Sequence, residues 1–439
     1  MQLRFLSLAL ALLFSGGSLR SQEPSSAALD GILLRPNLWE SKKEDFELEL
    51  SALSFEWTSA SQEMARSVSR ELAFCKHPLN EAILCFQGGK LVEARLLYFN
   101  RGDSGALRED EFEELLASIS TNLTELTGVR PVDSGRDATN AVKAQGRSWK
   151  SPESKYFLEW SVTKGSQLRR IPFRSEFIRL TVRPSGSAVT PVGSAPRTSR
   201  DTVMQFAGRD HVERSPGGDV KITDLPMVDQ GEKGYCVVAS VERVMRYYGA
   251  SVDQHELAQI ANSDAARGTS TTAMLTSLKK LTARLGVKVR SLYQWDLRDF
   301  LKFIDDYNRA TKRGKLASEI RLDDEVEDAD AFFSQMKPEI YKEVRMKKSA
   351  DFGRFKRDVQ RSIEEGIPLL WAVRIGLVSE KELPPTAIGG HMRIIIGYNN
   401  ATNEILYSDS WGMGHEEKRM PVDDAWTITN GLTCLQPLS

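Results

Sequence analysis

The chain has 439 residues, its hydrophobic content is 41%, and its 59 Lys and Arg residues almost balance its 60 Asp and Glu residues. This length exceeds what one compact core usually holds, so we expect two domains and connecting segments. The hydrophobic content is ordinary for a globular protein. The near-zero net charge argues against a nucleic-acid-binding protein, which would carry a strongly basic surface.

Residues 1–22 have the pattern of an export signal. Arg4 supplies the positive charge, residues 5–14 form a short apolar core, and small residues follow at positions 15–18. This core is too short to span a bilayer as a helix, and the sequence offers no longer apolar segment elsewhere. We therefore expect an exported protein, periplasmic or extracellular, without stable membrane insertion.

Residues 31–184 predict an α+β domain. Residues 81–86 and 91–99 read as two strands joined by a turn, and residues 108–126 have the apolar spacing of an amphipathic helix. Residues 156–162 and 176–182 alternate like paired strands. No catalytic combination of residues stands out here. The sequence leaves open whether this domain inhibits, targets or recruits.

Two features of this domain have alternative interpretations. Cys75 and Cys85 could close a hairpin as a disulfide in an oxidising compartment. A cationic cluster could bind an acidic partner, but a solvated surface is the favoured interpretation. The cluster consists of Lys164, Arg169, Arg170, Arg174 and Arg179.

Residues 185–218 are rich in Ser, Gly and Pro and predict a flexible linker, which could also hold the cleavage site of a pro-region. Residues 219–439 predict a second domain with a charged helical insertion at about 296–366. The acidic run at 323–330 lacks the glycine and ligand spacing of a calcium loop, so a solvated segment is favoured over a metal site. His255 lies in a capping-box-like helix start and is predicted to be exposed.

Cys236 is predicted to lie at the start of a helix. Apolar residues recur downstream of it at helical spacing, and Gly249 ends the pattern. Unpaired N–H groups and the helix dipole favour a thiolate at such a position. Gln230 precedes Cys236 by six residues, and its amide could donate to an oxyanion beside the sulfur. A small buried hydrophobic residue is the ordinary alternative for a single cysteine on a helix.

Two later segments favour the catalytic alternative. His391 follows Gly389 and Gly390 at the head of a β-prone run, and Asp409 ends a short strand just before Trp411. The turn-forming residues 399–403 between these strands predict a hairpin, which would place His391 and Asp409 at the same end of it. A thiol, an imidazole and a carboxylate in this order form a nucleophilic triad.

These motifs resemble the papain-like cysteine peptidases, and are most similar to the bacterial branch that includes the double-glycine leader peptidases of bacteriocin exporters. The resemblance covers the chain from about Leu225 onward. It departs from the family at Val237, where many relatives carry Gly or Trp, and in the long insertion. Asp409 replaces the Asn of papain itself, but the leader-peptidase branch tolerates Asp at this position. The resemblance implies a Cys236 helix packed on an antiparallel sheet, and it implies five roles. These are Cys236 as nucleophile, His391 as general base and acid, Asp409 as orienting residue, Gln230 as oxyanion donor and Trp411 as a shield of the triad.

The sequence thus predicts an exported cysteine peptidase that cleaves a peptide or protein substrate through a thioester. No metal or cofactor is implied. The same triad also serves acyltransferases, transglutaminases and cell-wall amidases, and a catalytically silent peptide-binding module of the same fold is the alternative from another class. A disulfide between Cys236 and Cys434 would remove the nucleophile, but the accompanying Gln, His and Asp argue against it.

Overall fold

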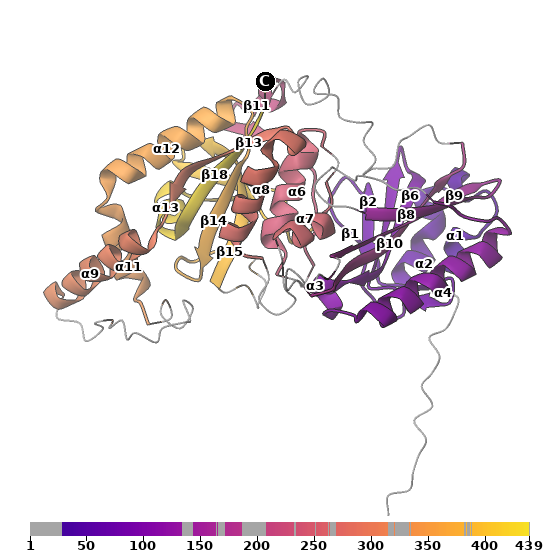
Figure 1. Ribbon diagram of the computed structural model, residues 1–439. Helices are drawn as coiled ribbons and strands as arrows, with labels where there is room; N and C mark the ends of the chain where they lie inside the picture. The colour runs from indigo at the N-terminus through magenta and orange to yellow at the C-terminus, as the bar shows by residue number, and fades with distance from the viewer. Residues whose placement is uncertain are drawn as a thin grey trace, which may run out of the picture.

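A computed structural model describes residues 29–133, 144–163, 165, 172–186, 208–231, 234–250, 252–261, 263, 269–314, 320, 333, 335–381, 383, 387 and 389–438. The predicted export signal, three cations of the cationic cluster (Lys164, Arg169 and Arg170) and the acidic run lie outside these residues. Two antiparallel sheets of eight strands each dominate the fold, and they lie in separate halves of the chain (Figure 1). The predicted α+β class is confirmed. Within the described residues, no helix has the length and apolar character needed to cross a membrane.

The N-terminal sheet has the strand order β1-β2-β5-β6-β10-β9-β8-β7. The predicted hairpin is β5 with β6, and the predicted helix at residues 108–126 is α4. The strands are β1 (Glu56–Trp57), β2 (Met64–Ser67), β5 (Glu81–Gln87), β6 (Lys90–Asn100), β7 (Val132–Asp133), β8 (Ala144–Lys150), β9 (Ser154–Thr163) and β10 (Arg174–Pro184), with the separate pair β3 (Ala73–Phe74) and β4 (His77–Pro78). The helices are α1 (Asp30–Leu33), η1 (Leu38–Glu40), η2 (Lys43–Phe46), α2 (Glu47–Ala52), α3 (Arg101–Ser104) and α4 (Glu109–Thr127).

The two faces of this sheet differ because side chains alternate along a strand. One face is apolar: Leu84 of β5, Leu158 of β9 and Leu180 of β10 join the core beneath α4. The opposite face carries charged side chains that are nevertheless buried. They are Arg66 of β2, Glu81 of β5, Glu93 of β6, Glu159 of β9, and Arg179 and Arg183 of β10. We call these six residues the charged face.

The C-terminal sheet follows the order β11-β12-β15-β14-β18-β13, and β16 and β17 extend it from β15. Its strands are β11 (Val212–Arg214), β12 (Asp219–Ile222), β13 (Val287–Gln294), β14 (Leu369–Ile375), β15 (Gly389–Asn399), β16 (Glu404–Ser408), β17 (Lys418–Pro421) and β18 (Thr429–Pro437). The helices are η3 (Gly208–His211), α6 (Cys236–Tyr247), α7 (Gln254–Ala261), α8 (Thr271–Leu285), α9 (Leu297–Arg313), α11 (Pro338–Met346), α12 (Ser349–Glu364) and α13 (Val422–Ile428). Helices α6 to α8 lie on one side of β14 and β18, and α12 and α13 on the other (Figure 1).

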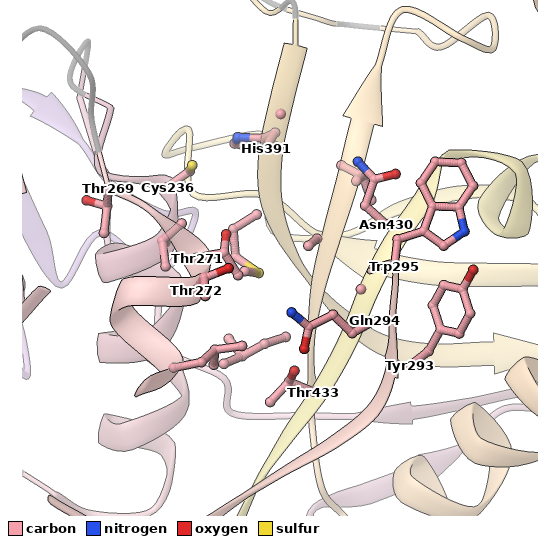
Figure 2. Close-up of a pocket in the computed structure, with 18 of the residues that line it drawn as sticks. Cys236, Thr269, Thr271, Thr272, Tyr293, Gln294, Trp295, His391, Asn430 and Thr433 are labelled. Atoms are coloured by element: carbon pink, nitrogen blue, oxygen red, sulfur yellow. The ribbon is translucent and has the colours of Figure 1, made fainter. Parts of the chain in front are cut away.

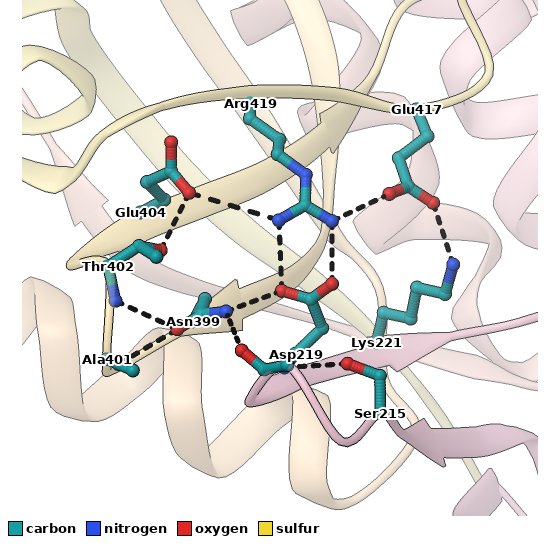
Figure 3. Close-up of polar contacts among 10 residues, drawn as sticks. Ser215, Asp219, Lys221, Asn399, Ala401, Thr402, Glu404, Glu417 and Arg419 are labelled. Atoms are coloured by element: carbon teal, nitrogen blue, oxygen red, sulfur yellow. Dashed lines mark hydrogen bonds and ion pairs between the residues drawn. The ribbon is translucent and has the colours of Figure 1, made fainter.

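A polar network connects strands of the C-terminal sheet near β16, the strand that Asp409 follows (Figure 3). The Arg419 guanidinium of β17 donates to both carboxylate oxygens of Asp219, at 3.0 and 2.6 Å. Asn399 of β15 donates to the same carboxylate at 2.7 Å. One aspartate therefore links β12, β15 and β17. This linkage fixes the register of the hairpin whose second strand runs into Asp409.

Two predictions need correction. The C-terminal sheet begins inside the predicted linker, because β11 pairs with β12 from Val212 onward. The four cysteines are free, so the disulfide considered for Cys75 and Cys85 is not formed, and Cys236 and Cys434, which were not expected to pair, are free as well. Cys75 lies beside Asp30, whereas Cys85 lies beside Arg95 and Arg246, in a different environment.

Candidate active site

Cys236 is the first residue of α6, as the sequence predicts. The apolar residues of this helix are buried in the core shared with the sheet, and α6 packs directly on β15, the strand of His391. Tyr235 is the N-cap residue of this helix, and its backbone conformation is not helical. The sulfur is therefore held at a helix N-terminus, where the dipole favours a negative charge.

His391 and Asp409 meet at the end of the hairpin formed by β15 and β16. The His391 Nε2 atom lies 2.7 Å from Asp409 Oδ1. On its other side, the His391 imidazole is hydrogen-bonded to the Cys236 thiol. The fold thus brings together three residues that are 155 and 18 positions apart in the sequence, in the order thiol, imidazole, carboxylate.

These contacts shift the ionisation of all three groups. Burial alone would raise the pKa of the Cys236 thiol, but the hydrogen bond and charge of His391 lower it. Burial would lower the pKa of His391, but its hydrogen bonds with Asp409 and Cys236 raise it to about 9. The pKa of the buried Asp409 carboxyl is lowered by Arg393 and then by His391. The arrangement therefore favours a thiolate–imidazolium pair near neutral pH.

Trp411 lies flat against the triad. Its ring stacks on the His391 imidazole with centroids 4.4 Å apart and an interplanar angle of 10°. The Lys418 ammonium lies 5.4 Å from the centroid of the Trp411 ring and 3.8 Å from Asp409 Oδ2. The indole thus keeps water from one face of the imidazole, which is the place the resemblance implies for a shielding residue.

Arg393 is a partner of the triad that the sequence reasoning missed. Its Nε donates to Asp409 Oδ1 at 3.1 Å, and its Nη1 lies 2.7 Å from Glu380 Oε2. Both carboxylates and the guanidinium are almost wholly buried. The signal was present, because residues 391 and 393 of a strand point to the same face. A cation two residues from the histidine is therefore placed to reach the same carboxylate.

Gln230 is oriented by Ser410, the residue that follows Asp409. The Ser410 hydroxyl donates to Gln230 Oε1 at 2.6 Å, and the Gln230 backbone N–H donates to the Ser410 carbonyl at 2.8 Å. The bond from the Ser410 hydroxyl occupies the oxygen of the Gln230 side-chain amide, so the NH₂ donor of that amide points away from Ser410. The segment around Gln230 is in this way attached to the loop that carries Asp409 and Trp411.

Cys236 and His391 open onto a cavity of about 530 Å³. In Figure 2, the thiol and the imidazole face each other at one end of it. Thr269, Thr271 and Thr272 lie on the side of the helices, and Gln294, Asn430 and Thr433 on the side of the strands. Hydroxyl and amide groups thus line part of the cavity, beside apolar side chains.

The predicted insertion supplies the far wall of this cavity. Trp295, Phe300 and Phe333 line it there, and Phe300 lies on α9. Arg345 of α11 holds this wall in place, with its guanidinium carbon 4.7 Å from the Trp295 ring centroid. The same guanidinium donates to the carbonyls of Trp426 and Thr429 at 2.9 and 2.7 Å. The insertion is therefore part of the site's architecture.

Comparison with known proteins agrees with this geometry. Residues 222–434 match the Peptidase_C39 like family, so the C-terminal half is similar to a class of cysteine peptidases. The resemblance that the sequence predicts is confirmed over these residues. No curated protein is significantly similar to the sequence.

Two solved structures resemble the chain in part. The peptidase domain of Streptococcus ComA, a bifunctional ABC transporter involved in a quorum-sensing pathway, is 15% identical; the match covers 49% of this chain and 99% of that one, with a TM-score of 0.25. Xylellain, a cysteine protease from Xylella fastidiosa, is 14% identical, and the match covers 54% of this chain and 90% of that one, with a TM-score of 0.27.

Proposed function

We propose that this protein is an exported cysteine peptidase that uses Cys236, His391 and Asp409 as its catalytic triad. The observation that carries the proposal is the unbroken line from the Cys236 thiol through the His391 imidazole to the Asp409 carboxylate, which opens onto a peptide-sized cavity. The family similarity of residues 222–434 supports the reaction class. The pattern of residues 1–22, which predicts an export signal, is the basis for proposing a periplasmic or extracellular location.

The first half-reaction forms an acyl-enzyme. The Cys236 thiolate attacks the carbonyl carbon of the scissile bond, and the carbonyl oxygen becomes an oxyanion that the Gln230 amide stabilises. When the carbon–nitrogen bond breaks, the His391 imidazolium gives its proton to the departing amine. The acyl group remains on sulfur as a thioester, and His391 is left neutral.

The second half-reaction releases the acid. His391 removes a proton from water, the hydroxide attacks the thioester carbonyl, and the bond to sulfur breaks, so thiolate and imidazolium are restored. Asp409 holds the imidazole by Nε2 throughout, which leaves its other nitrogen for the thiol and the substrate. An amine that attacks in place of water would make the protein an acyltransferase.

The proposal is tested with Cys236→Ala and His391→Ala in the purified mature protein. We expect each variant to fold and to lose peptidase turnover by at least about 10⁴-fold. The rate of Cys236 alkylation by iodoacetamide should reach its plateau at a pH well below about 8.5, which is the pKa of a free thiol. In His391→Ala, the midpoint of this pH profile should move to higher pH. Unchanged turnover in Cys236→Ala would exclude this site as the centre of activity.

A further inference from the structure

The segment between Gln230 and Cys236 is held from outside the catalytic half of the chain. The Arg66 Nη1 atom of β2 lies 3.3 Å from Asp229 Oδ2. The Asn100 side-chain amide, at the end of β6, donates to the Tyr235 hydroxyl at 2.9 Å. These two contacts bracket the segment, because Asp229 directly precedes the oxyanion donor Gln230 and Tyr235 directly precedes the nucleophile.

The contact is close enough to require glycine on both sides. A Cβ atom on Gly102 of α3 would lie 1.4 Å from the Tyr235 hydroxyl oxygen. A Cβ atom on Gly231 would lie 2.6 Å from Arg66 Nη2, and Gly231 also has a φ of +66°, which disfavours other residues. The N-terminal domain is therefore fitted against this segment without room for a methyl group.

A second contact reaches the loop that carries Trp411. The Ala60 backbone N–H, in the turn between β1 and β2, donates to Glu416 Oε1 at 3.0 Å. Asp229 itself lies beneath this loop, since a Cβ atom on Gly412 would be 3.2 Å from Asp229 Oδ2. The N-terminal domain thus contacts both segments that meet at the triad, the one that carries Gln230 and the one that carries Trp411.

Buried ion pairs fix the domains to each other. Arg179 of the charged face lies 3.1 Å from Asp253 and 2.7 Å from Glu256 of α7. The His255 Nε2 atom lies 3.6 Å from Glu81 Oε2. Separation would leave several of these charges without their partners, and re-docking would require them to be desolvated again. Such an interface suits a domain that stays in place and does not suit a pro-region that is released.

The N-terminal domain also leaves the cavity open. The described residues that line the cavity all lie between Cys236 and Thr433. The domain packs against the outer side of α6 and α7, away from the sheet that carries His391 (Figure 1). It contacts the back of the catalytic segment and does not cover the thiol.

From these contacts we propose that the N-terminal domain is a permanent brace of the catalytic centre, and that Arg66, Asn100 and Gly102 are positioning residues that hold Gln230 and Cys236 in register through Asp229 and Tyr235. This inference rests on the proposed function, because it assigns these residues to the same reaction. It excludes the inhibitory role that the order of the domains leaves open.

The test compares two glycine variants of the full-length mature protein. Gly102→Ala places a methyl group against the Tyr235 hydroxyl, whereas Gly31→Ala adds one in open space on α1. We expect Gly102→Ala to lower kcat about 10- to 100-fold with little change in KM, because catalytic geometry degrades steeply with displacement. We also expect its pH midpoint for Cys236 alkylation to rise toward that of a free thiol. Gly31→Ala should match the wild type in both measurements.

A folded Gly102→Ala variant with wild-type kcat and alkylation profile would overturn the inference, and so would one with increased turnover, which would indicate an inhibitory domain. If Gly102→Ala does not fold, Arg66→Lys decides the question. Lysine keeps a charge beside Glu81 but cannot reach Asp229 at the same time, so the same losses are expected, and unchanged values would overturn the inference. If the wild type shows no peptidase turnover but its alkylation profile still differs from that of Gly102→Ala, the result would support the brace and refute the proposed function.

Discussion

The two sheets have the same number of strands and the same antiparallel pairing, but they differ in how their second face is covered. In the C-terminal sheet, helices lie on both faces, and the central strands β14 and β15 are largely buried and apolar. In the N-terminal sheet, one face is an apolar core and the other is a layer of Arg and Glu side chains pressed against the catalytic half. A charged sheet face is therefore not always a face in water; here it is an interface within one chain.

The sharpest way to break this comparison is Arg179→Ala. This change would leave the buried Glu159 and Glu256, and the half-buried Asp253 beside them, without their shared cation. We expect the free energy of unfolding to fall by about 3–5 kcal/mol, measured from the midpoint and slope of urea unfolding. The matched variant is Arg70→Ala, an exposed arginine of the same domain, which should leave the midpoint unchanged. Equal midpoints in the two variants would mean that the charged face is solvated after all.

The counterpart in the C-terminal sheet is Asp409→Asn. The amide oxygen can still accept from His391 Nε2, and Arg393 already offsets the charge that is removed. We therefore expect turnover to fall only about tenfold, which corresponds to about 1.4 kcal/mol.

The pH profile of this variant gives a second readout. Turnover requires a protonated His391, whose pKa of about 9 sets the basic limb in the wild type. Loss of the carboxylate charge lowers this pKa, so the basic limb should move to lower pH. Asp110→Asn, a change at an exposed residue of the other domain, serves as control. A 10⁴-fold loss without a shift of the limb would contradict this prediction, because it would show that Asp409 acts mainly by orienting the His391 imidazole, which the amide does not reproduce.

The smallest effect is expected from treating the protein with a reducing agent, because the cysteines of the N-terminal domain are already free. Cys75 and Cys85 are free, so excess dithiothreitol should shift the thermal midpoint by less than about 1 °C. A disulfide would contribute about 2–4 kcal/mol, and its reduction would lower the midpoint by several degrees. Mass spectrometry of the denatured, unreduced protein after alkylation provides the direct measurement.

Local patterns in the sequence predicted the helix that begins at Cys236 and both strands of the hairpin correctly. Their signals, apolar spacing after Cys236 and turn formers between two β-prone runs, are contained in short stretches of chain. The structure brings the five residues of the predicted site to one place, Gln230 through its bonds with Ser410.

Two of the misses share one physical cause, which is that alternation and charge do not say what covers a polar face. His255 was expected to be exposed, but it is buried between Asp253 and Glu81. Arg179 was assigned to a solvated surface, but two of its acidic partners, Asp253 and Glu256, lie more than 70 residues downstream in the other half of the chain. Both errors arise at the interface between the domains, where the covering partner is distant in sequence.

The charged face has a consequence for how the protein is made. The N-terminal half leaves the ribosome before α6 and α7 exist, and domains generally fold as they are synthesised. An apolar docking face would be exposed to other nascent chains during that interval, whereas a layer of Arg and Glu stays hydrated. The charged face is therefore desolvated only when the second half of the chain is available to pack against it. Until then it stays hydrated, which keeps the N-terminal half from aggregating through this face.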